Sequence, residues 1–292
     1  MLDHKRANQK YVIITPVRDE EQFVEECLKS VTSQTIKPRK WIIINDGSTD
    51  GTRQIIEKYL KEHSWIQLVN LEDKGVRKPG GEYVLHIGFD MINIDDYEYI
   101  VRLDADLSFE KDFFEELFIR FSQDPSLGIA SGVCYIPVGH KLIEEVVPAF
   151  HTRGGNKVYR RNCLKQIGNI EHVMGFDTVD EVKANMLGWR TQGFRELRVI
   201  HHRRTGSAKG ILKGKINGGK SAYFASYHPL FMIVRGLWRM KDKPYIISGL
   251  ALMYGFFLGY ILRLPQVDDP DLIRYLRKQQ MNKLLLRHTI WK

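Results

Sequence analysis

Short apolar runs alternate with amphipathic stretches along the first half of this 292-residue chain. The runs 11–15, 41–44 and 99–103 are rich in Ile, Val and Tyr, as is typical of buried strands. Between them, apolar residues recur at helical spacing in 23–31 and 55–60. Strands that alternate with helices predict an α/β fold with a mainly parallel sheet flanked by helices.

Polar residues follow three of the predicted strands. Thr15 ends the first, Asp46 follows the second, and Asp104 and Asp106 follow the run 99–103. The carboxyl ends of parallel strands share one edge of a sheet, so we expect these side chains to meet at a site for phosphates and hydroxyls. If the segment stays extended, Asp104 and Asp106 face one spot, where a positive group is expected.

The regular alternation of strands and helices lapses from about Val138, which indicates that the second half of the chain is built differently. This half contains a glycine-rich stretch at 151–168, an acidic stretch at 175–189 and a strand-like stretch at 194–206. The three cysteines have no paired spacing, so neither a disulfide framework nor a zinc site is indicated. We expect them to fill core volume, in a reducing compartment.

Composition narrows the partners. The chain is 43% hydrophobic and 27% charged, as in ordinary folded proteins, and its net charge of +9 is concentrated in the last hundred residues. No zinc-finger, helix-turn-helix or RNA-binding pattern is present, so we expect no nucleic acid. Lipid headgroups and sugar-nucleotide phosphates are the anionic partners that the charge favours.

Four motifs stand in a familiar order: "IITPVRDEE", "WIIINDGSTDGT", "IVRLDADLSF" and "VYRRNCLKQIG", the last followed by acids. From Tyr11 to about Gly206 the chain resembles glycosyltransferase family 2, inverting enzymes with a GT-A fold. The resemblance implies a metal-dependent transfer of a sugar from a nucleotide-sugar donor. It also implies a catalytic domain over residues 1–210.

The resemblance places the donor along the strand ends. Arg18 is the most telling residue, because an arginine directly after a buried strand suits a phosphate or carboxylate partner. A turn and helix cap at Asp46–Ser48 and a solvated loop around Arg77 and Lys78 are the structural alternatives. The candidate donor-binding residues are Thr15, Pro16, Arg18, Glu20, Asp46, Ser48, Arg77, Asp104 and Ala105.

The resemblance also implies a bound Mg²⁺ or Mn²⁺. Asp106 would bind the metal directly, and Asp104 would serve the ribose or a metal-bound water. One of His201 and His202 would complete the metal shell, and the sequence does not decide which. The alternative role for Asp106, together with Ser108, is to cap the helix that follows.

An inverting transferase needs a general base to accept the proton of the acceptor hydroxyl. The acidic stretch offers Asp177, Asp180 and Glu181, in an Asp-Glu order that departs from the Glu-Asp pair of the family. The distance from Gly168 favours Asp180 as the base, whereas the distance to the following Gly-Trp favours Asp177. We expect Asp180, with Asp177 as the alternative; a role in the first turn of a helix is the structural alternative.

Residues 211–292 are expected to form a C-terminal, helical, membrane-associated region. The run 245–262 holds eighteen uncharged, mostly apolar residues, at the lower limit for crossing a bilayer, with basic residues on both sides. A spanning, a re-entrant and an interfacial arrangement all remain open, as does a helix packed on the catalytic domain. We expect the protein at the cytoplasmic face of the cell membrane.

The combined prediction is a metal-dependent inverting glycosyltransferase with a lipid-linked or cell-surface glycan acceptor. A nucleotidyltransferase is the first alternative, but it should carry a glycine-rich basic loop after the first strand, and "ITPVRDEE" is acidic without glycine. A non-catalytic GT-A scaffold is the second, but it would usually have lost an acid that is present here. The oligomeric state is not indicated.

Overall fold

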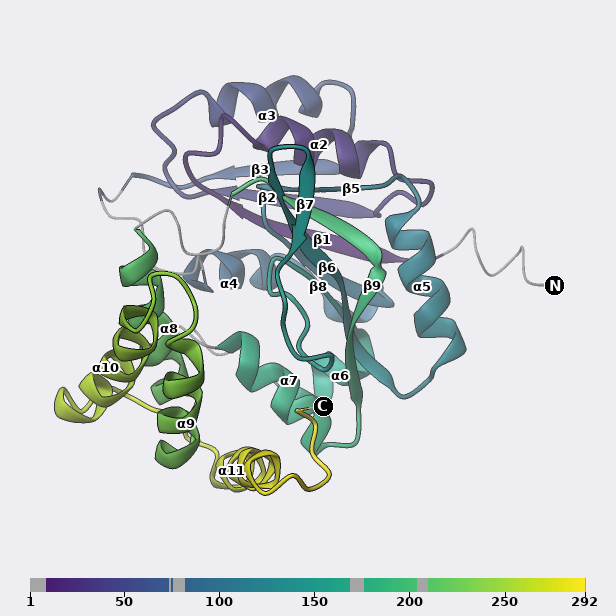
Figure 1. The fold of residues 1–292 in the computed structure, drawn as a ribbon. Helices are drawn as coiled ribbons and strands as arrows, with labels where there is room; N and C mark the ends of the chain where they lie inside the picture. The colour runs from purple at the N-terminus through teal and green to yellow at the C-terminus, as the bar shows by residue number, and fades with distance from the viewer. Residues whose placement is uncertain (1–8, 74, 76–81, 169–175, 204–209, 292) are drawn as a thin grey trace.

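The computed structural model describes residues 9–73, 75, 82–168, 176–203 and 210–291 (Figure 1). Within them, nine strands form one sheet in the order β3-β2-β1-β4-β8-β6-β9-β5, with β7 paired to β6. Arg77 and Lys78, two of the loop residues singled out above, lie outside the described residues.

The first half of the sheet is parallel, as the sequence predicts. Its strands are β1 (Tyr11–Val17), β2 (Lys40–Asn45), β3 (Ile66–Asn70) and β4 (Tyr99–Leu103). β1 pairs with β2 on one side and β4 on the other, and β3 pairs with β2, in each case in parallel. Because helices cover both faces here, β1, β2 and β4 are buried over nearly their whole lengths and need apolar residues at successive positions.

The second half of the sheet is mixed, and the expectation of a mainly parallel sheet is wrong there. β8 runs antiparallel to β4 and β6, β5 antiparallel to β9 and β7 antiparallel to β6, while β6 and β9 are parallel. These strands follow one another through turns as well as helices, and a pattern of apolar runs does not distinguish the two connections. They are β5 (Leu107–Phe109), β6 (Leu127–Val138), β7 (Lys141–Glu144), β8 (Asn156–Arg160) and β9 (Arg190–His201).

Helices cover both faces of the sheet (Figure 1). One face packs against α2 (Val24–Thr32), α3 (Thr52–Leu60) and α5 (Phe113–Gln123). The other packs against α4 (Glu82–Asp90), α6 (Arg161–Ile167) and α7 (Phe176–Met186). A 3₁₀ turn, η1 (Ile94–Asp96), precedes β4. The three cysteines are buried, as expected, in or against these two layers.

The last eighty residues form four helices beside the sheet domain (Figure 1). They are α8 (Ile211–Phe224), α9 (Pro229–Arg239), α10 (Ile247–Ile261) and α11 (Pro270–Leu284). Glycines let their backbones meet: a Cβ on Gly255 would lie 2.0 Å from the carbonyl oxygen of Ile216, and one on Gly249 would lie 2.2 Å from that of Gly236. Among the helices of the described residues, none combines the length and the apolar character needed to cross a membrane.

Candidate active site

The carboxyl ends of β2, β1 and β4 lie side by side, so the structure gathers the polar strand ends as the sequence predicts. Asp46 follows β2, Arg18 follows β1, and Asp104 follows β4. The guanidinium of Arg18 connects the first two, donating to the carbonyl oxygen of Asp46 at 2.7 Å. The same guanidinium pairs with Asp73, after β3, at 2.8 Å.

The pair Asp104 and Asp106 does not lie on an extended strand. The chain turns at Ala105 and Asp106 before β5 begins at Leu107, so the two carboxylates have different neighbours. Asp104 lies 3.8 Å from the guanidinium of Arg102, whereas Asp106 lies 3.5 Å from the ring of His201. The expectation that both side chains project in parallel from an extended segment is therefore wrong.

The alternative role of Asp106 as a helix cap is also ruled out by the structure. The strand β5 separates Asp106 from α5, whose N-cap residue is Asp112. Ser108 lies within that strand, where its hydroxyl is 2.7 Å from Nε2 of His202. Asp106 thus has no structural duty at a helix terminus and is held instead against His201.

The two histidines at the end of β9 point to different neighbours. His201 Nε2 lies 3.5 Å from Asp106 and its Nδ1 lies 3.1 Å from Glu145, so its ring stands between two carboxylates. His202 bonds to Ser108, and its ring stacks on Phe23. Burial lowers the pKa of His202. Of the two histidines, His201 is the one that faces the acidic cluster.

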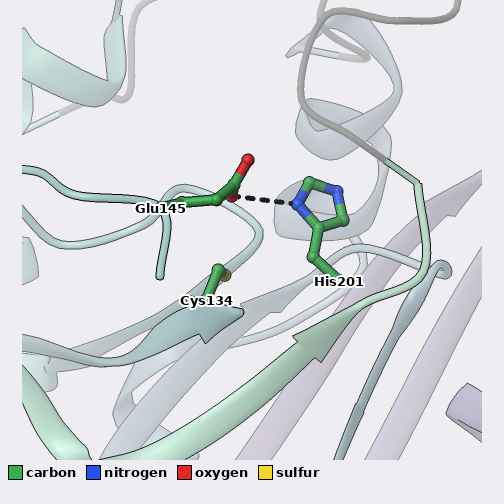
Figure 2. A group of neighbouring side chains, drawn as sticks. All are labelled: Cys134, Glu145 and His201. Carbon is green, nitrogen blue, oxygen red and sulfur yellow. Dashed lines mark hydrogen bonds and ion pairs between the residues drawn. The ribbon is translucent and has the colours of Figure 1, made fainter. Parts of the chain in front are cut away.

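Figure 2 shows His201, Glu145 and Cys134 around one point, with ligand atoms that lie within 4.8 Å of one another. Glu145 comes from the chain just after β7 and also binds Arg153 at 3.1 Å. Burial raises the pKa of Cys134 to about 12, so its thiol keeps its proton at neutral pH. Since the thiolate is the metal-binding form of cysteine, Glu145 and His201 are the better donors of this group.

The donor set around His201 fits a divalent cation. Two carboxylates and one imidazole are ligands that Mn²⁺ accepts. The two carboxylates of this site also suit Mg²⁺, which prefers oxygen ligands. Burial alone would lower the pKa of His201, but hydrogen bonds to Asp106 and Glu145 raise it to about 9. Because only the neutral imidazole can bind a metal, a cation at this site would replace the ring proton and supply the positive charge that these carboxylates require.

Glycine lets the neighbouring loop approach the first aspartate. A Cβ on Gly155 would lie 2.7 Å from Oδ2 of Asp104, too close for any other residue without a shift. The backbone amide of Asp104 donates to the carbonyl oxygen of Gly155 at 2.7 Å. The glycine-rich stretch noted in the sequence therefore positions β8 against the end of β4.

Glu20 and Arg203 form an ion pair between the chain segments that follow β1 and β9. Glu20 follows β1, is 5% exposed and bonds through its carboxylate to Arg203, which follows β9. The guanidinium of Arg203 also lies over the ring of Phe23, 5.5 Å from its centroid. Arg203 is the last described residue before 204–209, which lie outside the described part of the chain.

The remaining candidates for donor binding lie at the strand ends with varied exposure. Thr15 is 1% exposed, and its hydroxyl accepts a hydrogen bond from the indole of Trp41 at 2.8 Å. Ala105 is 4% exposed and packs in the core. Pro16 and Ser48 are half-buried, and the hydroxyl of Ser48 accepts from the amide of Asp19 at 3.1 Å. Thr15 and Ala105 thus help to hold the strand ends in place.

A buried charged cluster lies between β8 and α7. Lys157, on β8, has a fully buried side chain, and its ammonium donates to both oxygens of Asp180, at 3.1 and 3.0 Å. It also lies 3.1 Å from Glu181, and Tyr159 donates to Asp180 at 2.6 Å. The loop before β8 completes the cluster, since His151 Nδ1 lies 2.8 Å from Glu181.

This cluster bears on the choice of base. Asp180 is 5% exposed and both its oxygens are hydrogen-bonded, so it has buried partners in place of an open approach for a hydroxyl. Asp177 lies one turn earlier, in the first turn of α7, which begins at Phe176. The backbone of Asp177 is described, whereas its side chain lies outside the described part of the structure.

Three residues of this region gave no signal in the sequence. Glu145 lies in the irregular segment after β7, Asp73 in the loop after β3, and Lys157 inside β8. Lys157 stands in the mostly polar run "NKVYR" of 156–160, and its partner Asp180 follows only 23 residues later, so no local pattern marks the pair. Glu145 and Asp73 contact His201 and Arg18 only in the folded chain, so no sequence motif marks them.

The first half of the chain, which carries the strand ends with Asp46, Asp104 and Asp106, matches one family. Residues 12–163 match the model of the family described as Glycosyl transferase family 2, which spans more than half of the chain. The chain belongs to glycosyl transferase family 2. This match confirms the resemblance carried by the four motifs and the expectation of a glycosyltransferase.

Curated relatives match part of this chain. The poly-beta-1,6-N-acetyl-D-glucosamine synthase of Staphylococcus epidermidis is 34% identical over 114 residues, which cover 39% of this chain and 26% of the relative. Glycosyltransferase GlyA of Streptococcus pneumoniae is 26% identical over 128 residues, covering 42% and 17%. The matched region thus spans about a quarter or less of each relative.

Solved structures resemble the whole fold. A mannosyltransferase from Pyrobaculum calidifontis, PcManGT, in complex with GDP-Man and Mn²⁺, has a TM-score of 0.57 at 16% identity, over 97% of this chain and 89% of that one. Residues 1–349 of Staphylococcus aureus TarS have a TM-score of 0.56 at 14% identity, over 93% and 82%. These likenesses confirm a mixed α/β fold of the GT-A kind.

Proposed function

We propose that the protein is a metal-dependent inverting glycosyltransferase that uses a nucleotide-sugar donor. The observation that carries the proposal is the convergence of Asp106, His201 and Glu145 at the edge of the sheet where β4 ends in Asp104, beside the carboxyl ends of β1 and β2. Ligands of α/β sheets bind at such edges. Related folds whose structures contain GDP-Man with Mn²⁺, or UDP-GlcNAc, support this type of donor.

The metal site is proposed to consist of Asp106 and His201, with Glu145 beside them. A bound Mg²⁺ or Mn²⁺ would neutralise the charge of the diphosphate leaving group. Asp104, more exposed than Asp106, is proposed to bind the ribose or a water of the metal shell. His202 is proposed to support this shell only indirectly, because it is bonded to Ser108.

The donor nucleotide is proposed to lie against Asp46 and Arg18, which the structure holds together through the Asp46 carbonyl. Glu20 and Arg203 bound the same edge of the sheet, and Arg203 offers a guanidinium fork suited to a phosphate. The assignment of Pro16, Ser48 and the other strand-end candidates to donor binding stays a prediction.

The general base is proposed to be Asp177. Of the two aspartates that the sequence favours, Asp180 is 5% exposed and its oxygens are hydrogen-bonded to buried Lys157 and Tyr159, which leaves no open approach for an acceptor hydroxyl. Asp177 precedes it by three residues at the start of α7. Asp177 would take the proton of the acceptor hydroxyl as that oxygen attacks the anomeric carbon, and the nucleoside diphosphate leaves with the bonding electrons.

The acceptor is proposed to be a lipid-linked or cell-surface glycan, and the enzyme to act at the cytoplasmic face of the cell membrane. The support is the tail of residues 211–292, whose helices carry many exposed apolar side chains. A membrane-associated tail would bring a lipid-linked substrate near the catalytic part of the chain.

The reaction products test this proposal. The purified full chain is incubated with UDP-GlcNAc or GDP-mannose, in detergent, with Mn²⁺, Mg²⁺ or EDTA, and the nucleotide products are separated. The proposed enzyme should release a nucleoside diphosphate, even if only by slow transfer of the sugar to water. It should do so with Mn²⁺ or Mg²⁺ and not with EDTA. Release of pyrophosphate would identify a nucleotidyltransferase instead, and thermal stabilisation by the donor without any turnover would identify a non-catalytic scaffold.

A further inference from the structure

The helix α9 has its apolar face on the outside. Its exposed positions recur at i, i+3, i+4, i+7 and i+8, the spacing of a single helical stripe. In most proteins that stripe faces the core; here the inner face is formed by other residues, Phe231, Met232 and Gly236. The outward stripe consists of Leu230, Ile233, Val234, Leu237 and Trp238, each between 39% and 56% exposed.

The neighbouring helix α10 repeats this arrangement. Its inner side packs through Gly249 against α9 and through Gly255 and Gly259 against α8, where added Cβ atoms would collide with backbone or ring atoms. The opposite side is left without a partner among the described residues. It carries a second stripe, Ile247, Leu250, Tyr254, Phe257 and Ile261, each between 37% and 74% exposed.

Positive charge surrounds these stripes. Residues 211–292 hold fourteen Lys and Arg against four Asp and Glu, whereas residues 1–210 hold 30 against 31, so the tail accounts for the whole basic excess of the chain. Exposed Lys241, Lys243 and Arg263 flank α10. The ammonium of Lys241 lies 3.5 Å from the centroid of the Trp238 ring, so a cation and an exposed indole stand together.

The only acid between residues 229 and 265 is already neutralised. Asp242 pairs with Arg239 at 3.0 Å and with Lys215 at 3.5 Å. The surface near the stripes therefore combines exposed aliphatic and aromatic side chains with cations and no free anion among the described residues. This composition is complementary to an anionic lipid surface, where apolar side chains enter the acyl region and cations remain with the headgroups.

We propose that the two stripes form a docking face for an anionic phospholipid bilayer, with α9 and α10 lying in the interface. The proposal deepens the proposed function, on which the choice of the membrane as partner rests. An interfacial position also fits the size of α10: its fifteen residues extend about 22 Å, less than the roughly 30 Å of a hydrocarbon core. We call the ten stripe residues the α9/α10 face. Membrane docking through this face explains why α10 is strongly apolar although it is too short to span a bilayer.

Vesicle binding tests the α9/α10 face with the full chain. Cosedimentation is measured with vesicles of phosphatidylcholine alone and with vesicles containing one-third phosphatidylglycerol. We expect strong binding only to the anionic vesicles, weakened by salt. Leu250→Glu should reduce the partition coefficient about tenfold, because it removes a leucine that the bilayer would bury and adds a negative charge.

A matched control separates the face from hydrophobicity in general. Leu142, on β7, is 46% exposed, close to the 50% of Leu250, and lies in the sheet domain away from the tail helices (Figure 1). Leu142→Glu should bind vesicles like the wild type. Circular dichroism and thermal melting of both variants show whether each is folded. If Leu250→Glu is not folded, Leu237→Glu, on α9, provides a second test of the face.

Two outcomes overturn the proposal. One is vesicle binding unchanged in folded Leu250→Glu and Leu237→Glu. The other is a wild-type dimer in solution that these variants dissociate while vesicle binding is absent, which would make the face an interface between copies of the chain. Metal-dependent release of nucleoside diphosphate in detergent is measured alongside, so that a failed docking face with intact turnover is distinguished from a failed assignment of the enzyme.

Discussion

The buried cluster of Lys157, Asp180 and Glu181 predicts that Asp180 contributes to stability and not to proton transfer. Asp180→Asn keeps the size of the side chain but removes the charge that faces Lys157 and Tyr159, at 3.0 and 2.6 Å. Hydrogen bonds to charged groups contribute about 1.5–3 kcal/mol each, and one asparagine oxygen can still accept a single bond. We expect a loss of about 3 kcal/mol of unfolding free energy, or a melting temperature lower by about 6–12 °C.

Lys157→Met is the companion variant. It leaves two buried carboxylates without their common cation, and breaking such a pair from one side costs about 3–5 kcal/mol. Because Asp180→Asn removes one of those orphaned charges, the double variant should be more stable than the sum of the single losses predicts. Additive losses would show that the two side chains do not interact as the structure has them.

The assay compares transfer by folded Asp180→Asn and Asp177→Asn well below both melting temperatures. Asp177→Asn should melt like the wild type and lose about 10²–10⁴-fold in turnover number, the usual contribution of a general base. Asp180→Asn should stay within a few-fold of the wild type. A normal melting temperature with lost transfer in Asp180→Asn, together with full transfer in Asp177→Asn, would refute the reasoning and make Asp180 the base.

Three further outcomes follow from the structure. His201→Gln should abolish the stimulation of donor hydrolysis by Mn²⁺, whereas His202→Gln should retain it, because only the first ring faces Asp106; equal losses would contradict this. Burial alone would raise the pKa of Glu181, but His151 and Lys157 lower it below its ordinary value of 4.5. The ionised carboxylate therefore stabilises the fold at pH values above 4.5, and this stability is lost as the pH falls through the lowered pKa of the folded state. Glu181→Gln should flatten that acid limb in denaturation curves, and an unchanged limb would contradict the assignment. The three buried cysteines, whose thiol pKa values are raised by burial, should react with a thiol reagent only after unfolding, and rapid labelling of the native chain would contradict their burial.

The sequence predicts the first half of the fold well because its signals are local. Apolar runs mark β1, β2 and β4, and helical periodicity marks α2 and α3, at nearly the observed bounds. The polar residues after those strands meet because parallel pairing forces their ends to one edge. The second half is harder, because its strands pair antiparallel and out of chain order, which no local pattern specifies.

The same limit applies to the candidate site, where local patterns predict some residues and long-range pairing decides the others. His201, and not His202, faces Asp106 because β9 pairs with β5 in a register that a sequence does not reveal. Spacing alone favours Asp180 as the base, whereas its partner Lys157 lies on β8, 23 residues earlier in the chain. Glu145 reaches His201 only through the folding of the segment after β7. Long-range pairing therefore decides which of several plausible side chains form the site.

The most direct test concerns the metal held by Asp106. Binding of UDP and of GDP to the full chain is measured by calorimetry with Mn²⁺ and with EDTA, for the wild type and for Asp106→Asn. We predict that Mn²⁺ increases the affinity of the wild type for at least one nucleotide by tenfold or more, and that the increase is absent in a folded Asp106→Asn variant. Equal affinity with Mn²⁺ and with EDTA, or an undiminished metal effect in the variant, would contradict a cation site at Asp106.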